Sequence, residues 1–350
     1  MLTPWNDYLS VPDPEAAFDE CHRCCRGAYP RQREIIARIA EATRPRTVAC
    51  LGAGLLNDIP YCRLVRAGAT VHLVDWLPGI AQAGVARSII ERGENGDPAC
   101  VYCALGDDRA RAHCRRFTPN ASPAGGVCDQ FRPAPEPPLT CLSFEKGEHP
   151  LCHAEDATGG YAIAFADAVL DRLDGARTWK KAFAGAATAV KVARRRHTPL
   201  AIADASIDLV TSSMLISQFE HEPYRYFSHQ AAKRLGPPAP GESRRLAPAM
   251  DALRTALLGD QIERHCDEIE RILAPGGRCF MSFEAFQYSP AGGRWFLVAE
   301  MHAALARLAR RFDFDFDLIG EADMVLRSHT AEHPALVYAF VLAPKRRQGA

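Results

Sequence analysis

Short apolar runs typical of buried strands alternate with helical segments along most of this chain. Residues 47–51 (TVACL) and 70–76 (TVHLVDW) are two such runs, and helical patterns follow them to about residues 66 and 90. Two parallel strands need a long crossover between them, and an α-helix usually provides it. The alternation therefore predicts a parallel sheet with helices on both of its faces.

The alternation resumes after residue 150. The strict pattern of 312–317 (FDFDFD) predicts a half-buried strand with its phenylalanines on one face, and 335–344 (ALVYAFVLAP) is close enough to pair with it as an antiparallel hairpin. We expect an α/β fold of the doubly wound type, with a seven-stranded, mostly parallel sheet that ends in this hairpin. The other expected elements are strands beginning at 151, 206 and 278, and helices over 164–173, 179–196, 247–273 and 296–310.

Two segments interrupt the pattern. Residues 1–45 are expected to form an N-terminal helical extension, in which 13–43 are helical, and residues 46–345 to form one domain. Within that domain, residues from about 93 to 150 contain eight prolines and five cysteines and show little periodicity. This composition predicts an insertion that contributes little to the core.

The charges of the chain balance, with 42 Lys and Arg against 42 Asp and Glu, so no overall field attracts nucleic acid or an anionic membrane. No apolar stretch approaches the roughly 18 residues of a membrane span. The first residues, MLTPWNDYLSVPDPE, lack the basic and apolar regions of a signal peptide. We therefore expect a cytoplasmic protein with no membrane partner.

Thirteen cysteines in such a chain are expected to be thiols rather than a disulfide framework. Cys50 and Cys279 lie inside predicted strands and should be small core residues. ECHRCC (20–25) and CVYC (100–103) contain C-x2-C pairs, the spacing with which one loop offers two thiolates to zinc. A structural zinc site normally has a second equally tight pair, for which His113-Cys114 with Cys128 is a poor substitute, so we expect scattered thiols and no metal.

A glycine turn follows the first predicted strand, at Gly52 and Gly54 in VACLGAGLLNDIP (48–60). A strand, a glycine turn and a helix N-terminus together form an anion and nucleotide site. A dinucleotide fingerprint would need a third glycine at position 57, which is Asn57. The turn alone leaves open NAD, a different nucleoside ligand and an ordinary tight turn. A nicotinamide enzyme would also be expected to show a second mononucleotide half, which does not appear.

Several motifs in order resemble those of the class I S-adenosylmethionine-dependent methyltransferases, over residues 45–92 and 151–343. LGAG (51–54) matches the glycine turn of that family, EDAT (155–158) its acidic turn after the third strand, and LAPGG (273–277) its signature before the fifth strand. SIDLVTSSMLISQF (206–219) is similar to the fourth strand and the loop that follows. The resemblance implies the fold described above, S-adenosylmethionine as cofactor, and methyl transfer as activity.

The resemblance also implies roles for particular residues. Asp75, which ends the second strand, would hold the ribose hydroxyls, and Asp156 the adenine amino group. Asp107 lies at a more usual distance from Asp75 and is the alternative to Asp156. The cofactor-binding residues implied in this way are Gly52, Gly54, Asp58, Asp75, Trp76, Asp156, Ala157, Ser212 and Ser213.

The chain departs from the family pattern at two positions of the glycine turn. Cys50 stands where the family usually carries an acid, two residues before the first glycine, and Leu56 stands at its third glycine position. Asn57 or Asp58 would then supply the missing polar contact.

The loop after the fourth strand is where the substrate of this family meets the methyl group. Its polar and aromatic residues point to His221 and Tyr224 as catalytic groups, with His221 taking a proton from the acceptor, and to Gln218, Glu222 and Tyr226 as substrate contacts. The Asn/Asp-Pro-Pro-Tyr signature is absent, which argues against DNA bases and glutamine as acceptors.

We therefore expect a small-molecule acceptor. One alternative is an RNA or protein acceptor bound by the basic stretch 180–197. The other is a non-catalytic protein that binds a nucleoside or a metal on a degenerate methyltransferase fold, because fold alone does not settle function.

Overall fold

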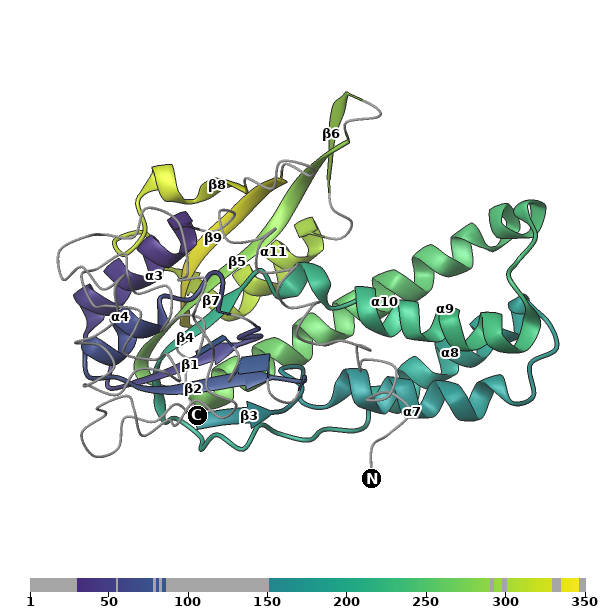
Figure 1. Ribbon diagram of the computed structural model, residues 1–350, viewed down its shortest axis with the longest axis horizontal. Coiled ribbons are helices and arrows are strands. Elements are labelled where there is room, and N and C mark those ends of the chain that lie inside the picture. Colours follow the sequence, from purple (N-terminus) through teal and green to yellow (C-terminus); the bar gives the residue numbers. More distant parts are fainter. Residues whose placement is uncertain are drawn as a thin grey trace, which may run out of the picture.

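The computed structural model describes residues 30–54, 56–77, 80–81, 84–85, 151–289, 293–297, 301–328 and 335–345 (Figure 1). Of the expected N-terminal extension it describes helix α3 (Pro30–Thr43). The expected insertion at about 93–150, Asp107 and the two C-x2-C pairs lie outside the described residues.

A single mixed sheet, mostly parallel, organises the described residues, and its strand order is β3-β2-β1-β4-β5-β9-β7. Strands β1 to β5 pair in parallel, whereas β9 is antiparallel to both β5 and β7. Two short strands were not expected: β6 pairs with β5, and β8 pairs with β9. The described sheet therefore has nine strands instead of seven. They are β1 (Thr47–Leu51), β2 (Thr70–Asp75), β3 (Leu151–Ala154), β4 (Ile207–Ser213), β5 (Leu273–Ser289), β6 (Arg294–Leu297), β7 (Phe312–Phe314), β8 (Val325–Ser328) and β9 (Ala335–Pro344).

Helices cover both faces of the sheet, as the alternation of strands and helices predicts. Alternate residues of β1 point to opposite faces. Val48 and Cys50 join a cluster with residues of α3 and α4 (Tyr61–Arg66), and Ala49 and Leu51 join a cluster with residues of α10 (Pro240–Ile272) and α11 (Met301–Arg311). Cys50 and Cys279 are buried in these clusters, as expected.

A lobe of helices extends from one end of the sheet (Figure 1). It consists of α7 (Tyr161–Leu173), α8 (Trp179–Ala193), α9 (His221–Leu235) and the first half of α10. This helical lobe has its own hydrophobic cluster, built around Tyr161, Phe165, Trp179, Phe183, Tyr226, Phe227 and Leu257. α10 contains 33 residues, so it is about 50 Å long and reaches from the lobe back to the sheet.

The structure corrects three local expectations. The helix after the glycine turn begins only at Tyr61, because Pro60 and the positive φ of Leu56 (58°) keep residues 56–60 irregular. Residues 221–226 belong to helix α9 rather than to a loop. The strand expected at 312–317 ends at Phe314, and Phe316 is 60% exposed.

None of the helices that the structure describes is both long enough and apolar enough to cross a bilayer.

Candidate functional site

A cavity of about 540 Å³ lies where the first four strands end. Ligands of parallel α/β sheets bind beyond the carboxyl ends of the strands, and a cavity of this volume can hold a ligand of nucleoside size. Eight of the nine expected cofactor-binding residues line it. They are Gly52, Gly54, Asp58, Asp75, Trp76, Asp156, Ala157 and Ser213.

Asp75 ties the glycine turn to the end of β2. One of its carboxylate oxygens accepts a hydrogen bond from the backbone N–H of Gly54 (2.9 Å), and the other accepts one from Leu77 (3.0 Å). Burial raises the pKa of Asp75, and these backbone bonds partly offset that effect. Asp75 therefore presents a fixed, buried carboxyl group to the cavity.

Asp156 fixes the turn between β3 and α7. Its carboxylate accepts bonds from the N–H (2.8 Å) and hydroxyl (2.5 Å) of Thr158 and from the N–H of Ala162 (2.9 Å). It thereby satisfies donors at the start of α7, where unpaired backbone N–H groups need acceptors. Both carboxylate oxygens already accept bonds within this turn. Asp156 therefore stabilises the part of the cavity wall to which it belongs.

Asp58 is the third buried carboxyl group of the cavity. The hydroxyl of Ser213 donates to it, yet burial raises its pKa to about 6, even though the charge of Arg33 on α3 acts in the opposite direction. The buried thiol of Cys50 interacts with this carboxylate, and its own pKa is raised to about 12, mainly by burial. The charge of Asp58 therefore acts on the Cys50 thiol, although the sequence has no acid at position 50.

Ser212 is the expected cofactor residue that does not line the cavity. It is buried, and its hydroxyl lies 2.8 Å from Nε2 of His265 on α10. Nδ1 of the same ring lies 2.9 Å from the carbonyl oxygen of Ala157. Ser212 therefore lies behind the lining and is linked through His265 to Ala157, which lines the cavity.

The polar face of α10 is a part of the site that the sequence did not reveal. Gln261, His265 and Glu268 are spaced by four and three residues, so they share one helix face, and all three are buried. Gln261 donates to the carbonyl of Phe219 (2.6 Å), and Glu268 accepts from the N–H of Leu200 (2.9 Å). This face fixes three loops around the cavity, and only the helical spacing of three polar residues could have signalled it.

The acceptor side of the site differs from the sequence expectation. Gln218 and Glu222 line the cavity, but His221, Tyr224 and Tyr226 do not. Residues 221 and 224 lie about 100° and 200° around α9 from Glu222. His221 is exposed, and the ring of Tyr224 packs under the guanidinium of Arg254 at 5.7 Å.

Tyr226 lies one helical turn beyond Glu222 and is fully buried in the cluster of the helical lobe. The structure therefore does not bring His221, Tyr224 and Tyr226 to the cavity. α9 replaces the expected loop, and its helical periodicity turns His221 and Tyr224 away from the side of Glu222, whereas Tyr226 lies one turn further along, inside the lobe cluster.

The charged side chains that line the cavity, among the described residues, are all acidic. Among the described residues that line it, there are five carboxyl groups and no Lys, Arg or His. Three of the five are the buried groups described above, and the other two belong to Glu155 and Glu222. An anionic ligand would meet like charges there, whereas a cation or a donor of hydrogen bonds would be attracted.

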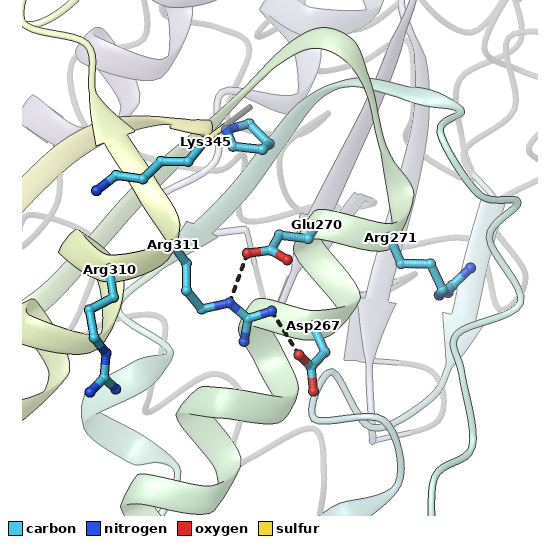
Figure 2. Close-up of a pocket in the computed structure, with 7 residues that line it drawn as sticks. Asp267, Glu270, Arg271, Arg310, Arg311 and Lys345 are labelled. Carbon is cyan, nitrogen blue, oxygen red and sulfur yellow. Dashed lines mark hydrogen bonds and ion pairs between the residues drawn. The ribbon is translucent and has the colours of Figure 1, made fainter. Parts of the chain in front are cut away.

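A second cavity, of about 600 Å³, lies where α10, α11 and β9 end. β9 runs opposite to β5, so this cavity is at the other edge of the sheet. Figure 2 shows Arg311 at its centre, bonded to Glu270 and Asp267 at 2.7 Å each. Both carboxylates of its lining are thus already paired with Arg311, and none of the expected site residues lines it.

Cys50, Cys152, Cys266 and Cys279 are free thiols. No group of three or more His, Cys, Asp or Glu side chains placed to hold a metal occurs within the described ranges. Comparison of the chain with models of known protein families and with curated protein sequences finds no match.

Proposed function

We propose that this protein transfers the methyl group of S-adenosylmethionine to a small molecule. The observation that carries the proposal is the cavity at the carboxyl ends of β1 to β4, with its five carboxyl groups and no cationic side chain among the described lining residues. The sheet is compatible with it, because the reversed strand β9 lies between β5 and β7 of an otherwise parallel path.

The chemistry of the lining suits this cofactor. S-adenosylmethionine carries a sulfonium and an ammonium group, which favour carboxylates nearby, and a ribose whose two hydroxyls can donate to one carboxylate. Asp75 would hold the ribose, Asp58 the ammonium group, and Trp76 and Ala157 the adenine. When bound, the cofactor supplies a methyl group on a positively charged sulfur.

The same lining disfavours NAD and other phosphate-bearing ligands. A pyrophosphate group needs free N–H groups at a helix N-terminus or cationic side chains. Here residues 52–54 and 56–60 are irregular, α4 begins only at Tyr61, and Asp58 and Asp75 flank the turn. The carboxylates would repel the phosphates, so we propose a nucleoside cation instead.

The acceptor side supports a small molecule. It is formed by Gln218 of η4 (Ile216–Gln218), Glu222 of α9 and Gln261 of α10, all of which line the one cavity. The basic stretch invoked for an RNA or protein acceptor begins on α8 and continues past its end at Ala193. Lys180, Lys181 and Lys191 are exposed there on the side of the helix that faces away from the lobe cluster, which suits a solvated surface.

Calorimetric titration tests the proposal. We expect S-adenosylmethionine and S-adenosylhomocysteine to bind and NAD not to bind. Asp75→Ala should weaken cofactor binding by about 1.5–3 kcal/mol, the range for a hydrogen bond to a charged group. Unchanged affinity in this variant would remove Asp75 from the site.

Asp208→Ala is the matched control. The Asp208 carboxylate also accepts two backbone N–H bonds, from Arg46 (2.8 Å) and Thr47 (3.1 Å), but at the start of β1, at the opposite edge of the sheet. Both variants should lose stability, and only Asp75→Ala should lose affinity. Cofactor binding with no methyl transfer to any acceptor in a cell extract would favour the non-catalytic alternative.

A further inference from the structure

The acceptor end of the cavity contains a single ionisable side chain among the described residues that form it. This end consists of Met214, Leu215, Gln218, Phe219, Glu222 and Gln261. Glu222 is the ionisable one, and its neighbours offer apolar surface and amides. A substrate bound there would meet one negative charge and no positive one from the lining.

The carboxylate of Glu222 is held in place by its position on α9. It lies in the first turn of the helix, where the helix dipole favours a negative charge. Arg225 donates to it from the solvent side at 2.9 Å, and the Arg225 side chain is 57% exposed. The nearby Glu220 does not compete for this role, because its carboxylate is paired with Arg254 (2.5 Å).

The amide of Gln261 is committed as a donor. Its nitrogen bonds to the carbonyl oxygens of Phe219 (2.6 Å) and Leu257 (3.1 Å). This amide is therefore not free to receive an acidic substrate, and the described part of the lining has no cationic side chain that could do so. A carboxylic or phosphorylated acceptor would be repelled by Glu222 and by the other carboxylates of the cavity.

We infer that the acceptor is a small primary or secondary amine, which the carboxylate of Glu222 binds. The inference rests on the proposed methyl transfer and names its substrate class. The ring of Phe219, which is held edge-on against His265 with centroids 5.1 Å apart, offers apolar surface for the body of such an amine.

The reaction then balances without a further reactant. The lone pair of the neutral amine nitrogen attacks the methyl carbon, and the carbon–sulfur bond breaks with its electron pair moving to sulfur. S-adenosylhomocysteine and an N-methylammonium product form. The extra proton on nitrogen leaves to Glu222 or to water.

Binding of matched probes to the protein saturated with S-adenosylhomocysteine tests this inference. Phenethylamine, 2-phenylethanol and 3-phenylpropanoate have similar bodies and differ in the polar group, and a short panel of alkylamines extends the amine arm. We expect at least one amine to bind, and the alcohol and the acid to bind at least tenfold more weakly.

Glu222→Gln should weaken amine binding at least tenfold and leave the affinity for S-adenosylhomocysteine unchanged. Glu242→Gln is the matched control, because Glu242 also lies in the first turn of a helix, α10, but does not line the cavity. It should leave both affinities unchanged.

Equal or tighter binding of the alcohol or the acid, failure of every amine to bind, or amine binding that survives Glu222→Gln would each overturn the inference. None of these results affects the proposed cofactor. If the wild-type protein does not bind S-adenosylhomocysteine, the proposed function fails, and this inference fails with it.

Discussion

The imidazole of His265 joins Ser212 to Ala157, two residues that lie at the ends of different strands. A carbonyl oxygen can only accept, so Nδ1 donates to Ala157 (2.9 Å), and Nε2 accepts the hydroxyl hydrogen of Ser212 (2.8 Å). Burial lowers the pKa of His265 to about 4, so the ring is neutral near pH 7. The end of β4 and the turn after β3 are thereby fixed to α10.

Replacement of His265 should destabilise the protein. In His265→Leu the buried Ser212 hydroxyl and Ala157 carbonyl lose their partner, so we expect the free energy of unfolding at pH 7 to fall by about 1–3 kcal/mol. The wild-type protein should also lose stability between pH 6.5 and 4, because only the unfolded chain binds a proton at this residue there. Urea denaturation across this pH range measures both effects.

His221→Leu is the control for His265→Leu, because it removes an exposed imidazole from the same region. It should change the free energy of unfolding by no more than about 0.5 kcal/mol. A pH profile that His265→Leu leaves unaltered would show that the ring is not a neutral bridge.

Replacement of Asp58 should make the protein more stable and a weaker cofactor binder. Its pKa of about 6 is above its ordinary value, so folding becomes less favourable as pH rises from about 4 to 6. Asp58→Asn should therefore raise the free energy of unfolding by about 2–3 kcal/mol at pH 7 and change it little at pH 4. Calorimetry should show reduced affinity for S-adenosylmethionine at pH 7.

A stability gain with full cofactor affinity would leave Asp58 buried but outside the ammonium site. A loss of stability at pH 7 would contradict the raised pKa itself.

Alanine variants of Gly52 and Gly68 separate the effect of backbone strain from the effect of a contact at the cavity. Both have positive φ, 70° and 82°, so alanine at either position should be strained by about 1–2 kcal/mol. A Cβ at Gly52 would lie 2.7 Å from Cδ1 of Leu215, which lines the cavity, whereas a Cβ at Gly68 would contact nothing within 4 Å.

Both Gly52→Ala and Gly68→Ala should therefore lower the melting temperature. Only Gly52→Ala should weaken S-adenosylmethionine binding, by about tenfold or more, because Leu215, which lines the cavity, must shift to accommodate the added Cβ. Equal cofactor affinities in the two variants would exclude the glycine turn from the site.

The sequence predicted the parts of the fold and site that depend on local pattern. The bounds of β1 and β9 were predicted to the residue, because each is an apolar run bounded by breaking residues. Gly52, Asp75 and Asp156 come together at one cavity because each follows a parallel strand, and such strands end at one edge of the sheet.

The parts that the sequence did not predict depend on which helix faces which neighbour. A polar residue on a helix, such as His265, has the same local pattern whether it meets water or a carbonyl 108 positions away in the chain. Likewise, the sequence around Glu222 is compatible with a helix start and with a loop, and only the helix rotates His221 away from the cavity. Long-range contacts decide both cases.

The length of α10 bears on how this protein unfolds. Leu257 belongs to the cluster of the helical lobe, and the next residue, Leu258, belongs to a cluster of the sheet. Local unfolding of the helix at this point would expose both clusters, so neither cluster retains its packing once the other is lost. The lobe and the adjoining face of the sheet thus form one cooperative unit, and a truncated chain that ended between them would leave two incomplete cores rather than one independent domain.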